Sequence, residues 1–286
     1  MLLHEIQSPG GVRYQLQEMV HTSDCVQCYI GSCQEGARFI KIIAYGDQPG
    51  KERQLMQLWA KREADTMLRM SRCTPYTPKL YDHWDDRHRG VYVLVMQKLP
   101  GVTLSKWLEE HPLQNPNGKT LFVRNLILWQ VAEILLTVHR KIPGLSHRDI
   151  KPENILLDRD AQGHYRAYLI DFGTAGQNFT IGGGSDGYQA PEQLSHLGGS
   201  RSRIDVFALG MLWHRMLSDI PAQQTRWEFE EGETGDWESR PTLPQWVLDD
   251  RNGSKYQRLF EKMTAYDPEQ RAGLQLICEV LKVRRK

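Results

Sequence analysis

Two segments in the second half of the chain bring together side chains that could perform chemistry. HRDIKPENILLD (147–158) contains Asp149, Lys151 and Asn154 at fixed offsets, and YLIDFGTAG offers Asp171 at the end of an apolar run. A carboxylate can accept a hydroxyl proton, a lysine can neutralise a migrating phosphoryl group, and amide and carboxylate oxygens are ligands that Mg²⁺ prefers. These residue types in this pattern indicate phosphoryl transfer.

Another segment, HTSDCVQCYIGSC (21–33), has the composition of a zinc site. His21, Cys25, Cys28 and Cys33 are enough ligands for a tetrahedral shell. In a strand, however, Cys25 and Cys28 would point to opposite faces of the sheet, and a shared ion would require the strand to break. We therefore expect reduced cysteines without metal, and zinc remains the alternative.

The composition limits the classes of partner. The 286 residues are 40% hydrophobic and carry 36 Lys plus Arg against 35 Asp plus Glu, a net charge of +1. A charge near zero provides no broad field for nucleic acid or a membrane surface. The chain shows no secretory leader and no run approaching the roughly 18 uncharged apolar residues of a membrane span. We expect a cytoplasmic protein that binds neither nucleic acid nor membranes.

The elements that must position these residues change character along the chain. The first hundred residues predict strands at 13–20, 25–31, 37–45, 79–84 and 90–99, with one helix at 52–70. That helix repeats apolar residues at helical intervals: Leu55, Leu58, Ala64, Met67 and Met70. From Thr103 onward helical patterns dominate, at 103–111, 121–141 and 204–217. The sequence therefore predicts a small β-rich lobe joined to a larger helical lobe.

Three motifs in order carry a family resemblance. HRDIKPEN, DFG and GYQAPE resemble the catalytic loop, magnesium loop and activation-segment end of eukaryotic-type (Hanks-type) serine/threonine protein kinases. The resemblance implies a bilobal α+β protein-kinase fold, with a five-stranded antiparallel β lobe plus one helix (1–98) and a mainly α lobe (99–286). It also implies transfer of the γ-phosphoryl group of ATP, with Mg²⁺ or with Mn²⁺ in its place, to Ser or Thr hydroxyls of proteins, including the protein itself. Neither the substrate nor the oligomeric state is predicted.

The resemblance assigns roles to the reacting residues. Asp149 would be the catalytic base, Lys151 would contact the phosphate, and Asn154 and Asp171 would hold the metal. Lys41 in FIKI resembles the strand lysine that reaches the α- and β-phosphates. Its expected ion-pair partner is Glu63, with Glu52 as the weaker alternative.

Further positions match the family's nucleotide pocket and its supports. Met96 resembles the gatekeeper, the backbone of Gln97 and Leu99 would hydrogen-bond the adenine, and Val26 and Leu156 would contact the nucleotide. Glu192 is expected to pair with Arg271, and Asp205 to hold the catalytic-loop backbone. Four apolar positions match the stack that joins the lobes of active kinases: Met67, Leu80, His147 and Phe172.

Regulatory positions follow from the same match. Arg148 marks the subclass in which a phosphate on the activation segment pairs with this arginine. Among Thr174, Thr180 and Ser185, we expect Thr180 to be the phosphosite and Ser185 to position the catalytic Asp and Lys.

The segment before Lys41 departs from the family. Val26 lies fifteen residues before Lys41 and matches the valine of G-x-G-x-x-G-x-V, so the glycine positions are occupied by Met19, His21 and Asp24. Side chains there predict weaker nucleotide binding or another loop conformation. Phe39 replaces the small residue two before the lysine and would crowd the adenine.

These departures keep other functions in view. A pseudokinase that binds nucleotide or acts as a scaffold is the main alternative. A small-molecule kinase is disfavoured because it usually lacks both Lys151 and an APE-type substrate loop. The acidic stretch RWEFEEGETGDWE (226–238) is either a solvated connector or a docking surface for basic segments.

Overall fold

The computed structural model describes residues 4–176, 184–194, 202–226 and 242–282. The chain forms two compact units, Met1–Pro100 and Gly101–Lys286. The first unit ends two residues after the predicted boundary of the small lobe. Each unit is described by itself.

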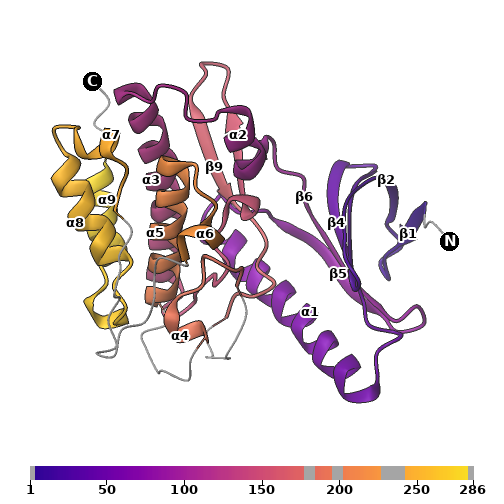
Figure 1. The fold of residues 1–286 in the computed structure, drawn as a ribbon. Helices are drawn as coiled ribbons and strands as arrows, with labels where there is room; N and C mark the ends of the chain where they lie inside the picture. Colours follow the sequence, from indigo (N-terminus) through magenta and orange to yellow (C-terminus); the bar gives the residue numbers. More distant parts are fainter. Residues whose placement is uncertain (1–3, 177–183, 195–201, 227–241, 283–286) are drawn as a thin grey trace. The chain divides into compact units, whose positions relative to one another are not determined.

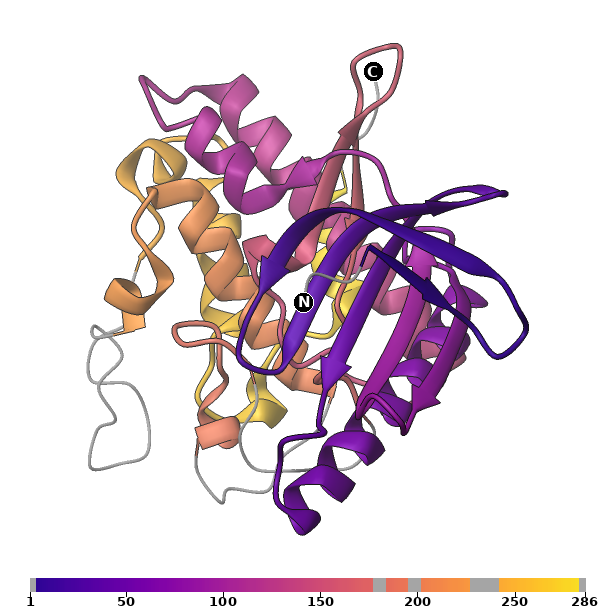
Figure 2. The same cartoon turned by 90° about the vertical axis from the view of Figure 1, so that its right-hand side faces the viewer.

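A six-stranded antiparallel sheet and one helix make up the first unit (Figure 2). The strands lie in the order β1-β2-β3-β4-β6-β5, with bounds Glu5–Gln7, Arg13–Thr22, Val26–Cys33, Gly36–Ala44, Val91–Gln97 and Leu80–Asp86. The predicted count of five strands is wrong by one, because β1 is too short to show a hydrophobic period. A turn signal does precede β2: SPGG closes with Ser8 N–H donating to Val12 O at 2.9 Å, and Gly11 has a φ of 83°.

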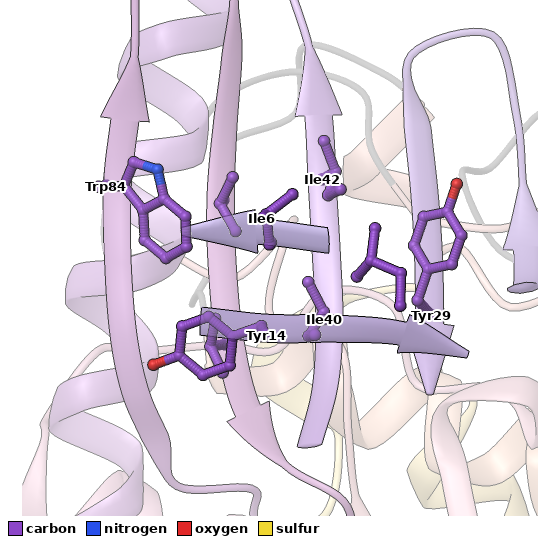
Figure 3. Packing of buried hydrophobic residues seen from close by; sticks show 9 residues of the cluster. Ile6, Tyr14, Tyr29, Ile40, Ile42 and Trp84 are labelled. Atoms are coloured by element: carbon purple, nitrogen blue, oxygen red, sulfur yellow. The ribbon is translucent and has the colours of Figure 1, made fainter. Parts of the chain in front are cut away.

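The sheet of the first unit curls around its own apolar core (Figure 3). β1 and β2 cross over β4, β5 and β6, so side chains from every strand meet on the enclosed face. Ile40 and Val95 are fully buried, and the rings of Tyr14 and Trp84 stack at 6.2 Å. The cluster consists of Ile6, Tyr14, Leu16, Tyr29, Ile40, Ile42, Trp84, Val93 and Val95. Because Ile40 and Ile42 point into this core, strand alternation places Lys41 on the other face.

Helix α1 (Gly50–Ser71) buries a different face from the one its apolar pattern suggests. Ala64, Met67 and Met70 are buried, as the helical period predicts. Leu55 and Leu58 retain 47% and 43% of their exposure, whereas the charged Glu63 is buried. An amphipathic period locates a helix, but it does not show which apolar residues face the core.

The second unit is built around two long helices that lie side by side, α3 (Gly118–Lys141) and α5 (Ser202–Ser218) (Figure 1). Trp213 of α5 is fully buried, and its Nε1–H donates to Asn125 Oδ1 of α3 at 2.8 Å. The other helices are α2 (Leu104–Glu110), α4 (Pro191–Leu194), α6 (Ala222–Arg226), α7 (Gln245–Leu248), α8 (Gly253–Met263) and α9 (Leu274–Leu281), with 3₁₀ turns η1 (Pro152–Asn154) and η2 (Pro268–Gln270).

Local chemistry fixes where these helices begin. Thr103 Oγ1 accepts from Lys106 N–H at 3.2 Å and caps α2 at the residue where the sequence predicted this helix to begin. Asn117 and Thr120 form a capping box at the start of α3. Among the described helices, only α3 has the length and apolar composition to cross a membrane, and 56% of that apolar stretch is buried inside the protein. Burial of this kind is typical of a core helix.

The second unit also contains a small three-stranded sheet with the strand order β7-β8-β9. Its strands are Val102–Thr103, Ile155–Arg159 and Tyr165–Leu169. Gly101, the first residue of this unit, has a φ of 95°, and a Cβ there would lie 2.1 Å from Leu157 O. Only glycine fits this approach. The sheet carries the two segments that hold the polar residues of interest.

Candidate active site

One buried carboxylate holds the backbone of the segment His147–Asn154, which we call the catalytic loop. Asp205 of α5 accepts from His147 N–H at 2.9 Å and from Arg148 N–H at 2.8 Å, one bond to each oxygen. Arg148 adopts a φ of 71°, a conformation rarely used by residues with a side chain. The contact predicted for Asp205 forms, and it explains how this backbone conformation is maintained.

Asp205 stays ionised although it has no solvent exposure. Burial alone would raise its pKa, but the hydrogen bond and charge of His139, the charge of His147 and the Arg148 N–H outweigh burial and lower that pKa. His139 Nε2 lies 3.3 Å from Asp205 Oδ2. A carboxylate is therefore retained as the acceptor for both loop N–H groups. Burial lowers the pKa of Arg148, opposed by the charge of Asp205.

The two oxygens of Asp149 have different environments. Oδ2 accepts from Asn154 Nδ2 at 2.9 Å and lies 3.0 Å from Lys151 Nζ. Oδ1 is buried and hydrogen-bonds to no partner among the described residues. A buried polar oxygen without a partner is costly, so its persistence indicates a function. The loop fixes the carboxylate by one oxygen and leaves the other available to accept a proton.

Lys151 is held at both sides of its ammonium group. Besides Asp149 Oδ2, its Nζ donates to Ser185 Oγ at 2.5 Å. Ser185 thus lies at the position expected of a residue that orients the catalytic Asp and Lys. Gln193 of α4 connects the same region to the loop, because its Nε2–H donates to Arg148 O at 3.2 Å.

Asn154 and Asp171 offer oxygens suited to a hard cation. Both hydrogens on Asn154 Nδ2 are engaged, by Asp149 O at 2.8 Å and Asp149 Oδ2, which leaves the amide oxygen for a ligand. The backbone joins the two residues through Ile170 N–H, which donates to Asn154 O at 2.9 Å. Asp171 is exposed and has a φ of 60°, and its Oδ1 accepts from Gly173 N–H at 3.2 Å. An amide and a carboxylate oxygen fit Mg²⁺, which is bound by few protein ligands together with phosphates.

The motif around Asp171 is fixed by its neighbours. Phe172 is buried and meets the His147 ring edge-on, with 5.0 Å between centroids. His147 Nε2 lies 3.1 Å from Ile170 O, and Thr174 Oγ1 donates to His147 O at 3.0 Å. Two of the four predicted stacking positions, His147 and Phe172, are therefore in contact within this unit.

In the first unit, Lys41 forms a buried ion pair with helix α1. Its Nζ lies 2.7 Å from Glu63 Oε1, and only 13% and 5% of the two side chains are exposed. The partner is Glu63 and not Glu52, which lies in the exposed first turn of the helix. Breaking such a pair leaves an uncompensated buried charge, so each residue fixes the position of the other.

Bulky side chains share the sheet face that carries Lys41. Phe39 is half-buried and pairs in register with Ile30 on one side and with Met96 on the other. Met96 and Leu99 are buried, and Gln97 N–H donates to Lys79 O at 2.8 Å. Val26 begins β3, and Leu156 lies in β8 of the second unit. Strand alternation thus places the aromatic ring of Phe39 on the same face of the sheet as Lys41.

The segment Met19–Val26, which we call the hairpin, closes without glycine. β2 remains paired to Thr22, and Ser23 N–H donates to Val26 O at 2.8 Å across the turn. Met19 is 46% exposed, His21 and Asp24 are also exposed, and none of the three has a positive φ. The two strands therefore form a hairpin without glycine, and the register of their pairing shifts between Met19 and His21, as at a β-bulge.

Cys25 and Cys28, in and beside the hairpin, lie in different environments. Cys25 precedes β3 and accepts from Gln48 Nε2 at 3.7 Å, whereas Cys28 is buried in β3, opposite Lys41 in register. Among the described residues no three His, Cys, Asp or Glu side chains gather as metal ligands would.

A buried ion pair supports the second unit away from the reacting groups. Arg271 Nη1 and Nη2 lie 2.6 and 2.7 Å from the two oxygens of Glu192, and both side chains are almost fully buried. This bidentate geometry is the strongest arrangement of the pair. The pairing predicted for Glu192 and Arg271 forms. Thr180 and most of the acidic stretch, from Trp227 onward, lie outside the described residues.

Comparisons with known proteins agree with this arrangement. The family model "Protein kinase domain" matches residues 30–282. Serine/threonine-protein kinase D of Synechocystis sp. is 31% identical over 210 residues, 68% of this chain and 37% of that protein. The human cAMP-dependent protein kinase catalytic subunit PRKX is 36% identical over 154 residues, 51% of this chain and 38% of that protein. Human Citron Rho-interacting kinase is 37% identical over 162 residues, 52% of this chain and 7% of that protein.

The matched region contains every reacting residue described above, from Lys41 to Asp171. The chain spans less than two fifths of the length of these three relatives. Two units of α+β structure, a complete catalytic loop and a family match over most of the sequence lead to one conclusion: the chain belongs to the protein kinase domain family, and it is similar to serine/threonine kinases of that family.

Proposed function

We propose that this protein is an ATP- and magnesium-dependent serine/threonine protein kinase that transfers the γ-phosphoryl group to protein hydroxyls, including its own. The observation that carries the proposal is the Asp149 carboxylate, with one oxygen held by Asn154 and Lys151 and the other buried without a partner in the described part of the chain. A hydroxyl placed at Oδ1 would give its proton to Asp149 as its oxygen bonds to phosphorus. ADP is the leaving group.

The other residues orient the reactants and balance charge. Lys151 neutralises charge on the migrating phosphoryl group while Ser185 holds it in place. Lys41, fixed by Glu63, contacts the remaining phosphates. Bound by Asn154 and Asp171, Mg²⁺ (or Mn²⁺) would neutralise charge on the phosphate oxygens. The hydroxyls that accept phosphate belong to a protein substrate, and we expect Thr180 to be one of the protein's own sites.

A transfer assay tests the reaction and the base together. Purified protein is incubated with radiolabelled ATP, Mg²⁺ and generic protein substrates, beside Asp149→Asn and Asp171→Asn variants. Label should enter Ser and Thr of the substrates only with the wild type. Transfer that persists in the Asp149→Asn variant would refute the assignment of Asp149 as the catalytic base. Phosphopeptide mass spectrometry that finds no phosphate on residues 174–185 would refute the site at Thr180.

A pseudokinase is the second candidate, favoured by the glycine-free hairpin and by Phe39 beside Met96. It predicts no transfer, with or without retained nucleotide binding. Thermal unfolding with and without Mg²⁺-ATP separates the cases, because a ligand that binds only the folded state raises the midpoint. A kinase requires a shift and transfer, whereas a scaffold shows no transfer.

We also propose that the protein acts in the cytoplasm. Its partners would be proteins and not nucleic acid or membranes, since a net charge of +1 provides no broad field for either.

A further inference from the structure

Helix α1 carries an apolar face that nothing among the described residues covers. Leu55, Leu58 and Trp59 have 47%, 43% and 57% of their surface exposed. Their spacing of three and four residues places them side by side on the helix. Apolar side chains that cluster on an exposed face indicate an interaction surface, whereas isolated ones do not.

Exposed charged residues flank this apolar face, and most of them are cations. Lys51 and Glu52 lie one turn before Leu55, and Lys61 and Arg62 lie one turn after Leu58. Over the whole helix the exposed charged residues are Lys51, Arg53, Lys61, Arg62 and Arg69 against Glu52 and Asp65. A partner for this face should therefore combine apolar anchors with negative charge. We call Lys51, Leu55, Leu58, Trp59 and Arg62 the α1 patch.

The chain itself contains a segment of that chemistry. WEFEEGETGDWE (227–238) carries six acids and three aromatic residues, Trp227, Phe229 and Trp237, and no cation. Aromatic residues are the usual anchors of protein interfaces, and interspersed acids match the cations of the patch. We call 227–238 the acidic segment; it lies outside the described residues, and its sequence alone enters the argument.

We propose that two copies of this protein associate by exchange, with the acidic segment of each copy bound to the α1 patch of the other. The interface is symmetric, because each copy gives one segment and receives one. Two short contacts of this kind bury little surface, so we expect dissociation in the micromolar range, on the order of 10 μM. Because charge contributes, the association should weaken at high salt.

Sedimentation equilibrium over a range from roughly tenfold below to tenfold above that concentration tests the proposal. The wild type should change from monomer to dimer, and 0.5 M salt should shift the change to higher concentration. Trp59→Glu should keep the protein monomeric throughout, because it puts an anion among the acids of the segment. Phe122→Glu, at an apolar position on α3 that is 47% exposed against 57% for Trp59, is the matched control and should dimerise like the wild type.

A peptide-binding assay tests whether the acidic segment is what binds the α1 patch. A fluorescent peptide of sequence WEFEEGETGDWE should bind the protein, and Trp59→Glu should weaken it at least tenfold. A peptide with its six acids changed to amides should also bind at least tenfold more weakly. The variant proteins must keep the wild-type melting temperature. A wild type that stays monomeric, a Trp59→Glu variant that still dimerises, or equal binding of both peptides would each overturn the proposal. None of these readouts depends on phosphoryl transfer.

Discussion

The catalytic loop and the hairpin meet different demands, although the resemblance assigns both to the handling of phosphate. In the loop the side chains of Asp149, Lys151 and Asn154 contact one another, and Arg148 is held at positive φ by Asp205. In the hairpin the side chains of Met19, His21 and Asp24 are exposed, and the strands pair with a shift of register between Met19 and His21. Proton transfer and metal binding require particular atoms at fixed positions, whereas covering phosphates with backbone N–H groups places weaker demands on sequence. The contrast explains why one segment matches the family and the other departs from it.

The largest expected effect is at the base. Asp149→Asn keeps the shape of the side chain but removes the proton acceptor, and we expect the rate of phosphoryl transfer to fall by about 10²- to 10⁴-fold. Glu153→Gln, an exposed position of the same loop, is the control and should retain the wild-type rate. Comparable losses in both variants would mean that the loop acts through its fold and not through this carboxylate.

The buried ion pair between Glu192 and Arg271 should contribute strongly to the free energy of unfolding. Glu192→Gln leaves Arg271 buried without its counter-charge, and we expect the free energy of unfolding to fall by about 3–5 kcal/mol. Urea denaturation followed by tryptophan fluorescence measures this loss. Arg89→Gln removes an ion pair on the surface of the first unit, in which Arg89 Nη1 lies 3.8 Å from Asp86 Oδ2. That control should change stability by no more than about 0.5 kcal/mol. Similar values for the two variants would contradict the assigned roles.

Acid should weaken the helix that supports the loop. His214 lies on α5, as Asp205 does, and burial lowers its pKa to about 4 from 6.5. Below pH 6.5 His214 binds a proton in the unfolded chain but not in the folded protein. The free energy of unfolding therefore falls as the pH drops from 6.5 towards 4. At pH 5 the loss from this group is about 2 kcal/mol relative to pH 7.5.

The variant His214→Phe isolates this contribution. Its unfolding free energy should change by about 2 kcal/mol less than that of the wild type between pH 7.5 and pH 5. His88→Gln, at an exposed position of the first unit, should leave the pH dependence unchanged. If His214→Phe and the wild type lose equal stability in acid, the buried neutral histidine does not account for the effect.

The smallest expected effect is in the hairpin. Asp24 is exposed and places a negative charge in the segment assigned to the phosphates. Asp24→Asn should lower KM for Mg²⁺-ATP by about two- to threefold and leave kcat unchanged, because an exposed charge acts weakly on ground-state binding. Asp47→Asn, exposed in the next loop, should alter neither constant. A change in kcat with Asp24→Asn would place the hairpin in the chemical step and remove the contrast with the loop.

The sequence predicted most strongly where chemistry restricts residue choice. The order of HRDIKPEN, DFG and GYQAPE was sufficient to predict the protein kinase fold, and the capping chemistry of Thr103 located α2. β1 could not be predicted by period, since three residues stabilise a strand only by pairing with β2 and by burying Ile6. Nor could sequence show that Asp149 Oδ1 has no hydrogen-bond partner among the residues that the structure describes, because that depends on where Asn154 and Lys151 point.

Helix α1 shows a second limit. Its apolar period included Leu55 and Leu58 with Met67, yet the tertiary fold buries Glu63 and exposes the two leucines. The choice of face depends on the ion pair with Lys41, which lies on a strand 22 residues away in sequence. A contact of that range is invisible to a local period.

Successive turns of α1 carry the α1 patch and the ion pair. Glu63, which pairs with Lys41, lies one turn after the exposed Trp59 of the patch, so the two sites are neighbours on one rigid element. A partner that binds the patch more tightly when the ion pair is formed must raise the population of that pair. By reciprocity, a ligand that engages Lys41 in its paired state must strengthen association at the patch by the same factor. Nucleotide occupancy and self-association would then each report on the other, and the ratio of dimerisation constants with and without nucleotide measures their coupling.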